Sequence, residues 1–425
     1  MKVARPELTI VHPSLLTTVL EASQAAGINH SKIFQFSDRP TTSPQGSTPD
    51  LRSILPSLWE AESYDWLDLR GKAAQNTTAA INFSSGTTGL PKGVSISHHN
   101  MVANLEQVSF ITKLDTQKAT NGRWVGFLPM YHAYGQLYSC LMCVLLSNPV
   151  YIMTKFDFID LMQTIQNYRL TTIHLVPPVL KMMADRPETA QYDLSSVQDV
   201  LCGAAPLSPD LRDRIRTRFG IIIREGYGMT ELTCAAMQTP IRLAQEGLLT
   251  AEGDEAADGR PGELYIHGPQ VFQSYWLNEM ATKESKTLDG WLKTGDIALR
   301  RHAEFWIVDR GKELIKVNGL QVSPAELEAI LGENSYVSDA AVVGVATERG
   351  EAPRAYVSIK DEAKDHTTEE QLAAWVAHRV ARHKWLTGGV MIVDGIPRLA
   401  SGKIDRKIIR GWTKGESTQD TRSKL

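Results

Sequence analysis

INFSSGTTGLPKGVSIS, residues 81–97, places glycine and hydroxyl side chains around a single lysine, between two apolar runs. We expect a strand that ends at Phe83, followed by a loop whose backbone N–H groups converge on an anion. The lysine would add a mobile positive charge, and the candidate contacts are Ser84, Ser85, Gly86, Thr87, Thr88, Gly89 and Lys92. It is not a Walker A loop, because Gly93 stands where that loop has Ser or Thr. A plain turn is the alternative, since a glycine-rich loop alone is a weak signal.

The length and composition of the chain indicate a globular protein with more than one domain. With 425 residues the chain exceeds a single hydrophobic core, and its 42% apolar and 22% charged residues are typical of folded domains. The net charge of -3 gives no electrostatic reason to expect nucleic acid or an anionic membrane as the main partner. The N-terminal sequence MKVARPELTIVH lacks the apolar stretch of a signal peptide.

The most apolar window, Leu137–Met153, is interrupted at residues 147–149 and is too short to cross a bilayer. We therefore expect no membrane span, and a buried core over this window. It contains Cys140 and Cys143 in C-x-x-C spacing, with no second pair to complete a zinc or redox site. A helix core is the better interpretation, because four cysteines are too few for a disulfide framework in a chain of this length.

Strand-like runs alternate with amphipathic stretches up to about Arg300, and this alternation predicts an α/β fold with helices on the faces of a sheet. Helices are expected at Phe158–Tyr168 and at Leu207–Phe219, the second with a Ser–Pro pair as its cap and first turn. The strand-like runs are AAINFSS, RWVGFLPM, NPVYIM, TTIHLVPP, VQDVLCGA and GIIIREGYG.

A change of composition after WLKTGDIALRR places a domain boundary near Asp309. The following segment predicts a charged turn, a short strand pair and a helix capped by Ser323, with Pro324 in its first turn. Three strands (DAAVVGV, AYVSI and GVMIVD) and a helix over Thr368–Val380 complete a small α+β unit. The expected domains are a large one over 1–308, a small one over 309–410 and a flexible tail over 411–425.

The last three residues, Ser423, Lys424 and Leu425, spell the peroxisomal import address. They end the polar segment TKGESTQDTRSKL, and a receptor reads such an address on a flexible, free end. We expect a peroxisomal import receptor as a partner and a peroxisomal location. A chance ending on a solvated tail is the alternative.

Two more motifs carry groups that suit a nucleotide. In EGYGMTE, Tyr227 could stack on a base, Thr230 could bond a phosphate and Glu231 could hold Mg²⁺, a hard ion that prefers oxygen ligands. In KTGD, Asp296 follows a glycine turn and could accept two ribose hydroxyls, and Arg310 could donate to the same sugar. Each residue also has an ordinary alternative, as a core tyrosine, a capping threonine or a surface charge.

The order of the motifs resembles that of the adenylate-forming acyl-CoA synthetases, in the branch that holds 4-coumarate–CoA ligases and firefly luciferase. The resemblance covers about Val3 to Arg410, and several motifs in order are far more specific than any one. It implies a large domain of stacked α/β sheets and a small, mobile α+β C-terminal domain. The motifs are SSGTTGLPKG, EGYGMTE, PGELYIHGP, YW, WLKTGD, DRGKELIKVNGLQVSPAELE and PRLASGKIDR.

The resemblance implies ATP, Mg²⁺ and CoA as ligands and assigns roles by position. The loop around Lys92 would bind the β- and γ-phosphates of ATP. Lys403 matches the lysine of the adenylation step, and Lys316 the lysine that acts after the small domain rotates. The other nucleotide contacts would be Glu225, Gly226, Tyr227 on adenine, Thr230 on the α-phosphate, Glu231 on magnesium, Asp296 and Arg310 on ribose, and Lys312 at the hinge.

The resemblance also implies an acyl pocket that begins at PMYHAYG, with His132 as its gate. The other pocket residues would be Tyr134, Cys202, Gly203, Ala204, Ala205, Gly226 and Cys234. The small side chains of residues 203–205 leave space for a flat aromatic group or a long acyl chain, and both remain open. CoA would contact Arg169, Asn318 and Gly319, although the coumarate ligases usually have lysine in place of Asn318.

Two features depart from the family pattern. The chain starts without the region that precedes PELTIVHPSLLTTVLEAS in relatives, and residues 241–260 are short and lack the usual G-x-x-G segment. We expect an N-terminally shortened large domain with uncovered sheet edges and apolar faces.

The predicted function is ATP-dependent activation of a carboxylic acid to acyl-AMP, followed by thioesterification to CoA. One alternative is a non-catalytic paralogue that keeps the motifs by descent, and another is an adenylation enzyme that passes the acyl group to a different acceptor. An amino-acid-activating domain is disfavoured, because FLPMYHAYGQL has no acidic residue for an α-ammonium group. A further alternative is luciferase-like oxidation, which would need a luciferin as its substrate.

Overall fold

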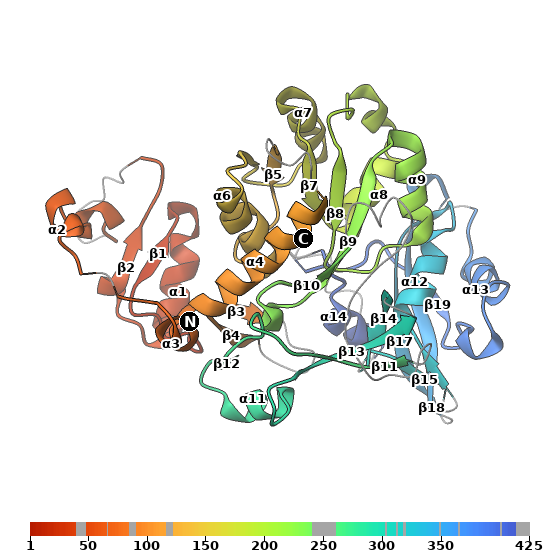
Figure 1. Ribbon diagram of the computed structural model, residues 1–425. Coiled ribbons are helices and arrows are strands. Elements are labelled where there is room, and N and C mark those ends of the chain that lie inside the picture. The colour runs from red at the N-terminus through yellow and green to blue at the C-terminus, as the bar shows by residue number, and fades with distance from the viewer. Residues whose placement is uncertain are drawn as a thin grey trace. The chain divides into compact units, whose positions relative to one another are not determined.

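The computed structural model confirms the α/β class (Figure 1). The chain divides into two compact units, Met1–Met101 with Phe272–Glu284, and Val102–Val271 with Ser285–Leu425. The structure describes residues 1–39, 48–65, 67–84, 91–115, 122–239, 261–301, 304–311, 313–317, 320–347, 350–363, 366–399 and 402–413.

The first unit holds two small sheets. Strands β1 (Thr9–Val11) and β2 (Ile33–Gln35) pair in parallel and are joined through helix α1 (Leu16–Ala26). Strands β3 (Thr78–Ser84) and β4 (Lys92–Ser97) pair antiparallel, and β12 (Ser274–Tyr275) joins the other edge of β4. The register of β3 and β4 sets Ser84 opposite Lys92, so the two ends of the predicted anion loop lie side by side. The short helices α2 (Leu58–Glu62), α3 (Lys72–Asn76) and α11 (Glu279–Ser285) complete this part of the chain.

The second unit is built on a six-stranded sheet of order β10-β9-β8-β7-β5-β6, in which only the edge strand β10 is antiparallel to its neighbour. The apolar runs predicted as strands supply it. The strands are β5 (Trp124–Gly126), β6 (Val150–Ile152), β7 (Thr172–Leu175), β8 (Asp199–Cys202), β9 (Ile222–Gly228) and β10 (Ala235–Gln238).

Helices cover both faces of this sheet. Successive side chains of a strand point to opposite sides, so one strand contacts both groups of helices. Val200 and Cys202 pack against one group of helices, α7 (Phe158–Tyr168), α8 (Pro177–Asp185) and α9 (Pro209–Phe219). Leu201, between them, packs on the other face with α4 (His98–Asp115) and the helical run Gln136–Met142.

The two helices predicted before Arg300 are confirmed. Helix α7 has the predicted bounds, and α9 begins at Pro209 after the cap Ser208, whose side chain accepts a hydrogen bond from the Leu211 N–H. Helices α4 and α8 were not predicted.

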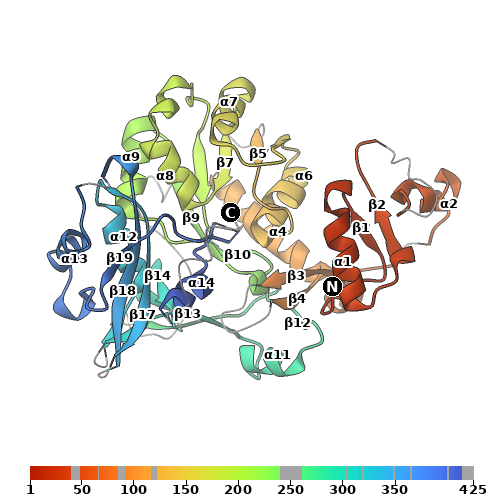
Figure 2. The same ribbon diagram turned by 180° about the vertical axis from the view of Figure 1, so that it is seen from behind.

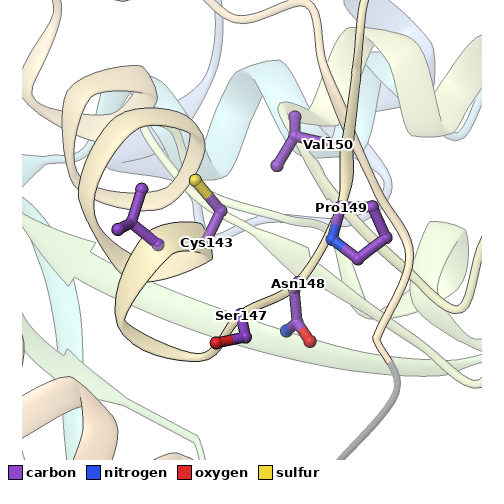
Figure 3. Close-up of a pocket in the computed structure, with 6 residues that line it drawn as sticks. Cys143, Ser147, Asn148, Pro149 and Val150 are labelled. Carbon is purple, nitrogen blue, oxygen red and sulfur yellow. The ribbon is translucent and has the colours of Figure 1, made fainter.

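The expectation of a buried core over the whole of Leu137–Met153 is wrong in part. Met142 and Cys143 are buried, whereas Val144 and Ile152 are 74% and 53% exposed. The window is not one element: α6 (Cys143–Leu145) ends, the chain turns, and β6 follows as an edge strand. Figure 3 shows that this turn, with Cys143 and Asn148, lines a surface pocket instead. None of the helices in the described ranges combines the length and apolar character needed to cross a membrane.

A three-stranded antiparallel sheet, β11-β13-β14, was not predicted as a sheet. It consists of β11 (Pro261–Ile266), β13 (Leu292–Arg301) and β14 (Glu304–Arg310). Its register sets Asp296 opposite Arg310, which brings the two predicted ribose contacts together.

The C-terminal part forms the predicted α+β unit around β17 (Val337–Thr347) and β18 (Gly350–Ile359). Figure 2 shows α12 (Pro324–Gly332) and α13 (Glu369–Ala377) on one side of this sheet and α14 (Arg406–Trp412) on the other. Helix α13 ends at Ala377, three residues before the predicted end at Val380. The remaining strands are β15 (Ile315–Val317), β16 (Leu320–Val322) and β19 (Val390–Ile392). The domain boundary near Asp309 stays a prediction.

Candidate nucleotide and acid-activating site

Three residues predicted to hold a nucleoside meet: Tyr227 near the end of β9, Asp296 in the middle of β13 and Arg310 at the end of β14. The Tyr227 hydroxyl donates to Oδ2 of Asp296 at 2.6 Å, and Nε of Arg310 donates to Oδ1 of the same carboxylate at 3.2 Å. Asp296 is only 4% exposed, and burial together with this carboxylate raises the pKa of Tyr227. The tyrosine therefore stays a neutral donor, and the carboxylate is fixed from two sides with lone pairs left for sugar hydroxyls.

Lys403 lies in the same electrostatic environment. Burial lowers the pKa of its amine, and the positive charge of Arg310 lowers it further. Three carboxylates act in the opposite direction and favour the ammonium form: Asp296, Glu231 and Glu313. The residues predicted separately for ribose, magnesium and adenylation are thus brought together, and Glu313 joins them without having been predicted.

Thr230 and Glu231 begin a 3₁₀ turn, Thr230–Leu232, directly after β9. Glu231 is buried, with 5% of its surface exposed. Mg²⁺ in nucleotide sites usually takes one or two carboxylates together with substrate phosphates, and Glu231 can supply such a carboxylate. Within the part of the chain that the structure describes, no group of three or more His, Cys, Asp or Glu side chains is placed to hold a metal ion without a substrate.

Glu225 and Gly226 precede this turn and are part of strand β9. Nη1 of Arg212 lies 3.4 Å from Oε1 of Glu225, and burial raises the pKa of this carboxyl against the effect of Arg212. Gly226 pairs with Gln238 across β9 and β10, and the position of its missing side chain is 3.5 Å from Leu201. These two predicted contacts lie on β9, next to Tyr227.

His132 and Tyr134, the predicted acyl-pocket residues, also lie in the second unit. Burial and the charge of Lys403 lower the pKa of His132, which keeps its imidazole neutral. The Tyr134 hydroxyl donates to the Leu201 carbonyl at 2.7 Å, and its ring is 3.5 Å from the position that a side chain at Gly203 would take. The turn after β8 continues through Ala204, in the left-handed region at φ 72°, to Ala205. Burial raises the pKa of the thiols of Cys202 and Cys234, so both stay protonated.

An aromatic cluster behind Tyr134 was missed from the sequence. Tyr138 stacks on His174 with ring centroids 4.4 Å apart, and its hydroxyl donates to Oε1 of Gln238 at 3.0 Å. Tyr138 follows Tyr134 by one helical turn, and His174 interrupts an otherwise apolar strand, so both carried a detectable signal.

Because His174 is buried, we predict that the folded protein loses stability in acid. Burial lowers its pKa to about 3, with Arg224 adding to the effect, whereas an unfolded histidine titrates near about 6.5. Between these values the unfolded chain binds the proton and the folded chain does not, so stability falls as the pH drops through this window. His174→Phe keeps the stacked ring and should show a smaller loss of urea midpoint between pH 7 and pH 4.5. An equal loss in both proteins would count against this assignment.

The predicted polyphosphate loop is described only at its ends. The Ser84 hydroxyl is buried and has no hydrogen-bond partner among the described residues, and Nζ of Lys92 lies 4.7 Å from the centre of the Tyr275 ring. A buried hydroxyl beside a cation fits an anionic ligand. Ser85, Gly86, Thr87, Thr88 and Gly89 lie outside the described residues.

The predicted CoA residues are only partly described. Arg169 caps α7 at φ 50°, and its Nη1 lies 3.5 Å from Oδ2 of Asp193, with both side chains more than half exposed. Lys316 is exposed on β15, so it occupies surroundings unlike those of the half-buried Lys403. Lys312, Asn318 and Gly319 lie outside the described residues.

With this geometry in place, comparison with known proteins assigns the family. The profile of the AMP-binding enzyme family matches residues 4–276, and that of the AMP-binding enzyme C-terminal domain matches residues 326–403. The chain belongs to the AMP-binding enzyme family. The resemblance inferred from the motifs is therefore confirmed.

Curated AMP-binding relatives include coumarate ligases. The chain is 40% identical over 350 residues to the probable 4-coumarate–CoA ligase 2 of Dictyostelium discoideum, covering 78% of this chain and 63% of the relative. It is 34% identical over 410 residues to 4-coumarate:CoA ligase 1 of Petunia hybrida, covering 91% of this chain and 74% of the relative. The chain thus spans less than two thirds of the length of the Dictyostelium relative.

Solved structures of adenylate-forming proteins match the fold. The crystal structure of ATP-bound MatB from Rhodopseudomonas palustris has a TM-score of 0.76 at 25% identity, over 97% of this chain and 80% of that chain. The o-succinylbenzoate–coenzyme A synthetase of Bacillus subtilis, in complex with ATP and magnesium ion, has a TM-score of 0.67 at 26% identity, over 79% of this chain and 70% of that one. The predicted arrangement of a large N-terminal and a smaller C-terminal domain is confirmed.

Proposed function

We propose that the chain is an AMP-forming acid–thiol ligase, which converts a carboxylic acid, ATP and CoA into an acyl-CoA, AMP and pyrophosphate. The observation that carries this proposal is the position of Lys403, whose amine is influenced by the candidate magnesium carboxylate Glu231 and the candidate ribose carboxylate Asp296. Family membership and the relatives named as CoA ligases support the same reaction.

In the first step, an oxygen of the substrate carboxylate attacks the α-phosphorus of ATP, and pyrophosphate leaves. Two anions approach each other, so catalysis consists of positioning and of neutralising charge on the phosphoryl oxygens. The ammonium group of Lys403 lies between the acid and the phosphate, and Thr230 donates its hydroxyl to the α-phosphate. Magnesium, when bound, neutralises phosphate charge, with Glu231 as its protein carboxylate.

The remaining predicted residues each bind a different part of ATP. Tyr227 stacks on adenine, while Asp296 accepts the ribose hydroxyls and Arg310 holds that carboxylate in place. Ser84 and Lys92 flank the loop that binds the outer phosphates.

In the second step, the CoA thiolate attacks the acyl carbon, the bond to the phosphate oxygen breaks and AMP leaves. The small domain turns about Lys312 and presents Lys316, while Arg169, Asn318 and Gly319 contact CoA. Such domain rotations are a common way to assemble a second active site.

The acid binds behind His132, against Tyr134 and the small residues Gly203, Ala204 and Ala205. The neutral imidazole of His132 allows a carboxylate and an apolar acyl group to pass without a competing ion pair. The relatives named as 4-coumarate–CoA ligases favour an aromatic acid over a fatty acid.

The test is pyrophosphate release by the purified chain with ATP, Mg²⁺ and a panel of aromatic and fatty acids, with and without CoA. We expect acid-dependent release with at least one acid, and the matching acyl-CoA by mass spectrometry when CoA is present. A folded protein that is silent across the panel would favour the non-catalytic alternative. Adenylate without thioester would favour a different acyl acceptor.

We further propose import into peroxisomes through Ser423, Lys424 and Leu425, which spell the import address. A fluorescent protein fused in front of residues 411–425 should collect in peroxisomes, and deletion of the three residues should release it. Diffuse fluorescence of the intact fusion would refute this proposal.

A further inference from the structure

Lys403 lies in the second of two paired segments, 397–399 and 402–405, which together we call the hairpin. The Leu399 N–H donates to the Lys403 carbonyl and the Gly402 N–H to the Leu399 carbonyl, each at 2.8 Å, and Arg398 bridges Ile404 in antiparallel fashion. Gly402 adopts a left-handed φ of 80°, which favours glycine at this position. A short hairpin of this kind is held by few bonds of its own, so its orientation depends on what anchors it to the domain.

Arg398 anchors the hairpin on one side. Its Nε and Nη2 donate to the two carboxylate oxygens of Asp339 on β17, at 2.9 and 2.7 Å. Its Nη1 donates at 2.6 Å to the carbonyl of Gly402, the residue directly before Lys403. One planar guanidinium therefore ties the backbone next to the lysine to a strand of the domain core, a geometry that lysine cannot reproduce.

Arg406 anchors the hairpin at its other end, three residues after Lys403. Its Nη1 and Nη2 donate to the two oxygens of Glu328 at 2.6 and 3.0 Å, and its Nε donates to Glu313 at 2.9 Å. Nη1 also donates to the Val342 carbonyl at 2.8 Å. These groups are at most 19% exposed, so the anchor is largely protected from solvent.

We propose that Arg398 and Arg406 are positioning residues, which clamp the hairpin from both sides so that Lys403 meets the reacting phosphate. The role in catalysis rests on the proposed function. The contacts of both arginines are with protein groups, so in this proposal each acts through the backbone on its side of the lysine. Because displacement of a catalytic group by about 1 Å can cost 10²-fold in rate, loosening one anchor should be visible in the step that uses Lys403.

The test compares Arg398→Lys with Arg379→Lys. Arg379 is a matched control in the same domain, since it lies on the Trp375 ring and donates to the Trp375 carbonyl, away from the hairpin. Two half-reactions are measured: acyl-adenylate formation from acid and ATP, and thioester formation from supplied acyl-adenylate and CoA. Hydrogen–deuterium exchange of the peptide covering residues 397–405 is followed in parallel.

We expect Arg398→Lys to lower kcat of adenylate formation by about 10- to 100-fold, with KM for ATP changed less than about threefold. Thioester formation should stay within about twofold of the wild type, and the hairpin should exchange faster. Arg379→Lys should resemble the wild type in all three measurements. Arg406→Lys should show the same pattern, and a folded Arg406→Lys protein with normal adenylate formation and normal exchange would remove Arg406 from the proposal.

Equal loss of both half-reactions in Arg398→Lys would overturn the inference, because it would mean a general structural defect. Unchanged adenylate formation with unchanged exchange would overturn it as well. If the wild type itself forms no adenylate with any acid, the proposed function fails. In that case the exchange experiment still decides whether Arg398 clamps the hairpin, since unaltered exchange in Arg398→Lys would refute the clamp.

Discussion

Replacing Lys403 with alanine is expected to slow acyl-adenylate formation by about 10²- to 10³-fold, the usual cost of removing one charge-stabilising donor. The affinity for ATP should fall less than about tenfold, because Tyr227, Asp296 and Arg310 form their cluster without the lysine. Single-turnover pyrophosphate release measures the first quantity, and calorimetric titration with ATP and Mg²⁺ measures the second.

The matched control is Lys407→Ala. Lys407 is exposed in the first turn of α14, four residues beyond Lys403, so its loss changes the net charge equally without touching the cluster. Thioester formation from supplied acyl-adenylate should survive in both variants. Adenylate formation by Lys403→Ala at a rate near that of Lys407→Ala would show that the lysine has no part in the step.

The second large effect concerns stability. Arg224 and Asp199 form an ion pair between β9 and β8, with Nε to Oδ2 at 2.8 Å and side chains 7% and 8% exposed. Breaking a buried pair by removing one partner typically costs about 3–5 kcal/mol, because a desolvated charge loses its counter-charge. Asp199→Ala should therefore lower the free energy of unfolding of the second unit by about this amount, measured by urea unfolding followed by tryptophan fluorescence.

Asp213→Ala is the control for this prediction. Asp213 also contacts an arginine, Arg216 at 3.1 Å, but both side chains are about half exposed, so we expect a loss below about 1 kcal/mol. Replacing the buried pair as a whole, with Asp199→Leu and Arg224→Met together, should recover much of the loss. Equal urea midpoints for Asp199→Ala and Asp213→Ala would disprove the importance of the buried pair.

Local signals in the sequence predicted the elements of the fold where side chains and backbone act within a few residues. The Ser–Pro pair at Ser208 gave the start of α9, and apolar runs gave the strands of the six-stranded sheet. The sheet β11-β13-β14 was not predicted, since its pairing depends on register between distant segments. The window Leu137–Met153 misled because apolar content alone shows neither that Val150–Ile152 form an edge strand nor that Val144 is exposed.

The same difference between local signals and long-range contacts holds for the candidate site. The motifs gave Tyr227, Asp296 and Lys403 separately, and only the resemblance to a family implied that they act together. The structure adds what no local pattern contains: the hydrogen bond from Tyr227 to Asp296, and the carboxylate of Glu313 near Lys403. The roles of the residues stay predictions, to be decided by the variants above.

The most direct test of the central claim, that this chain binds a nucleotide for acid activation, is a calorimetric titration of the folded protein with ATP in the presence and absence of Mg²⁺. We predict saturable binding that depends on magnesium and is weakened at least about tenfold by Asp296→Ala, which removes the carboxylate that would accept the ribose hydroxyls. A well-folded sample that takes up no ATP with magnesium present would contradict the account.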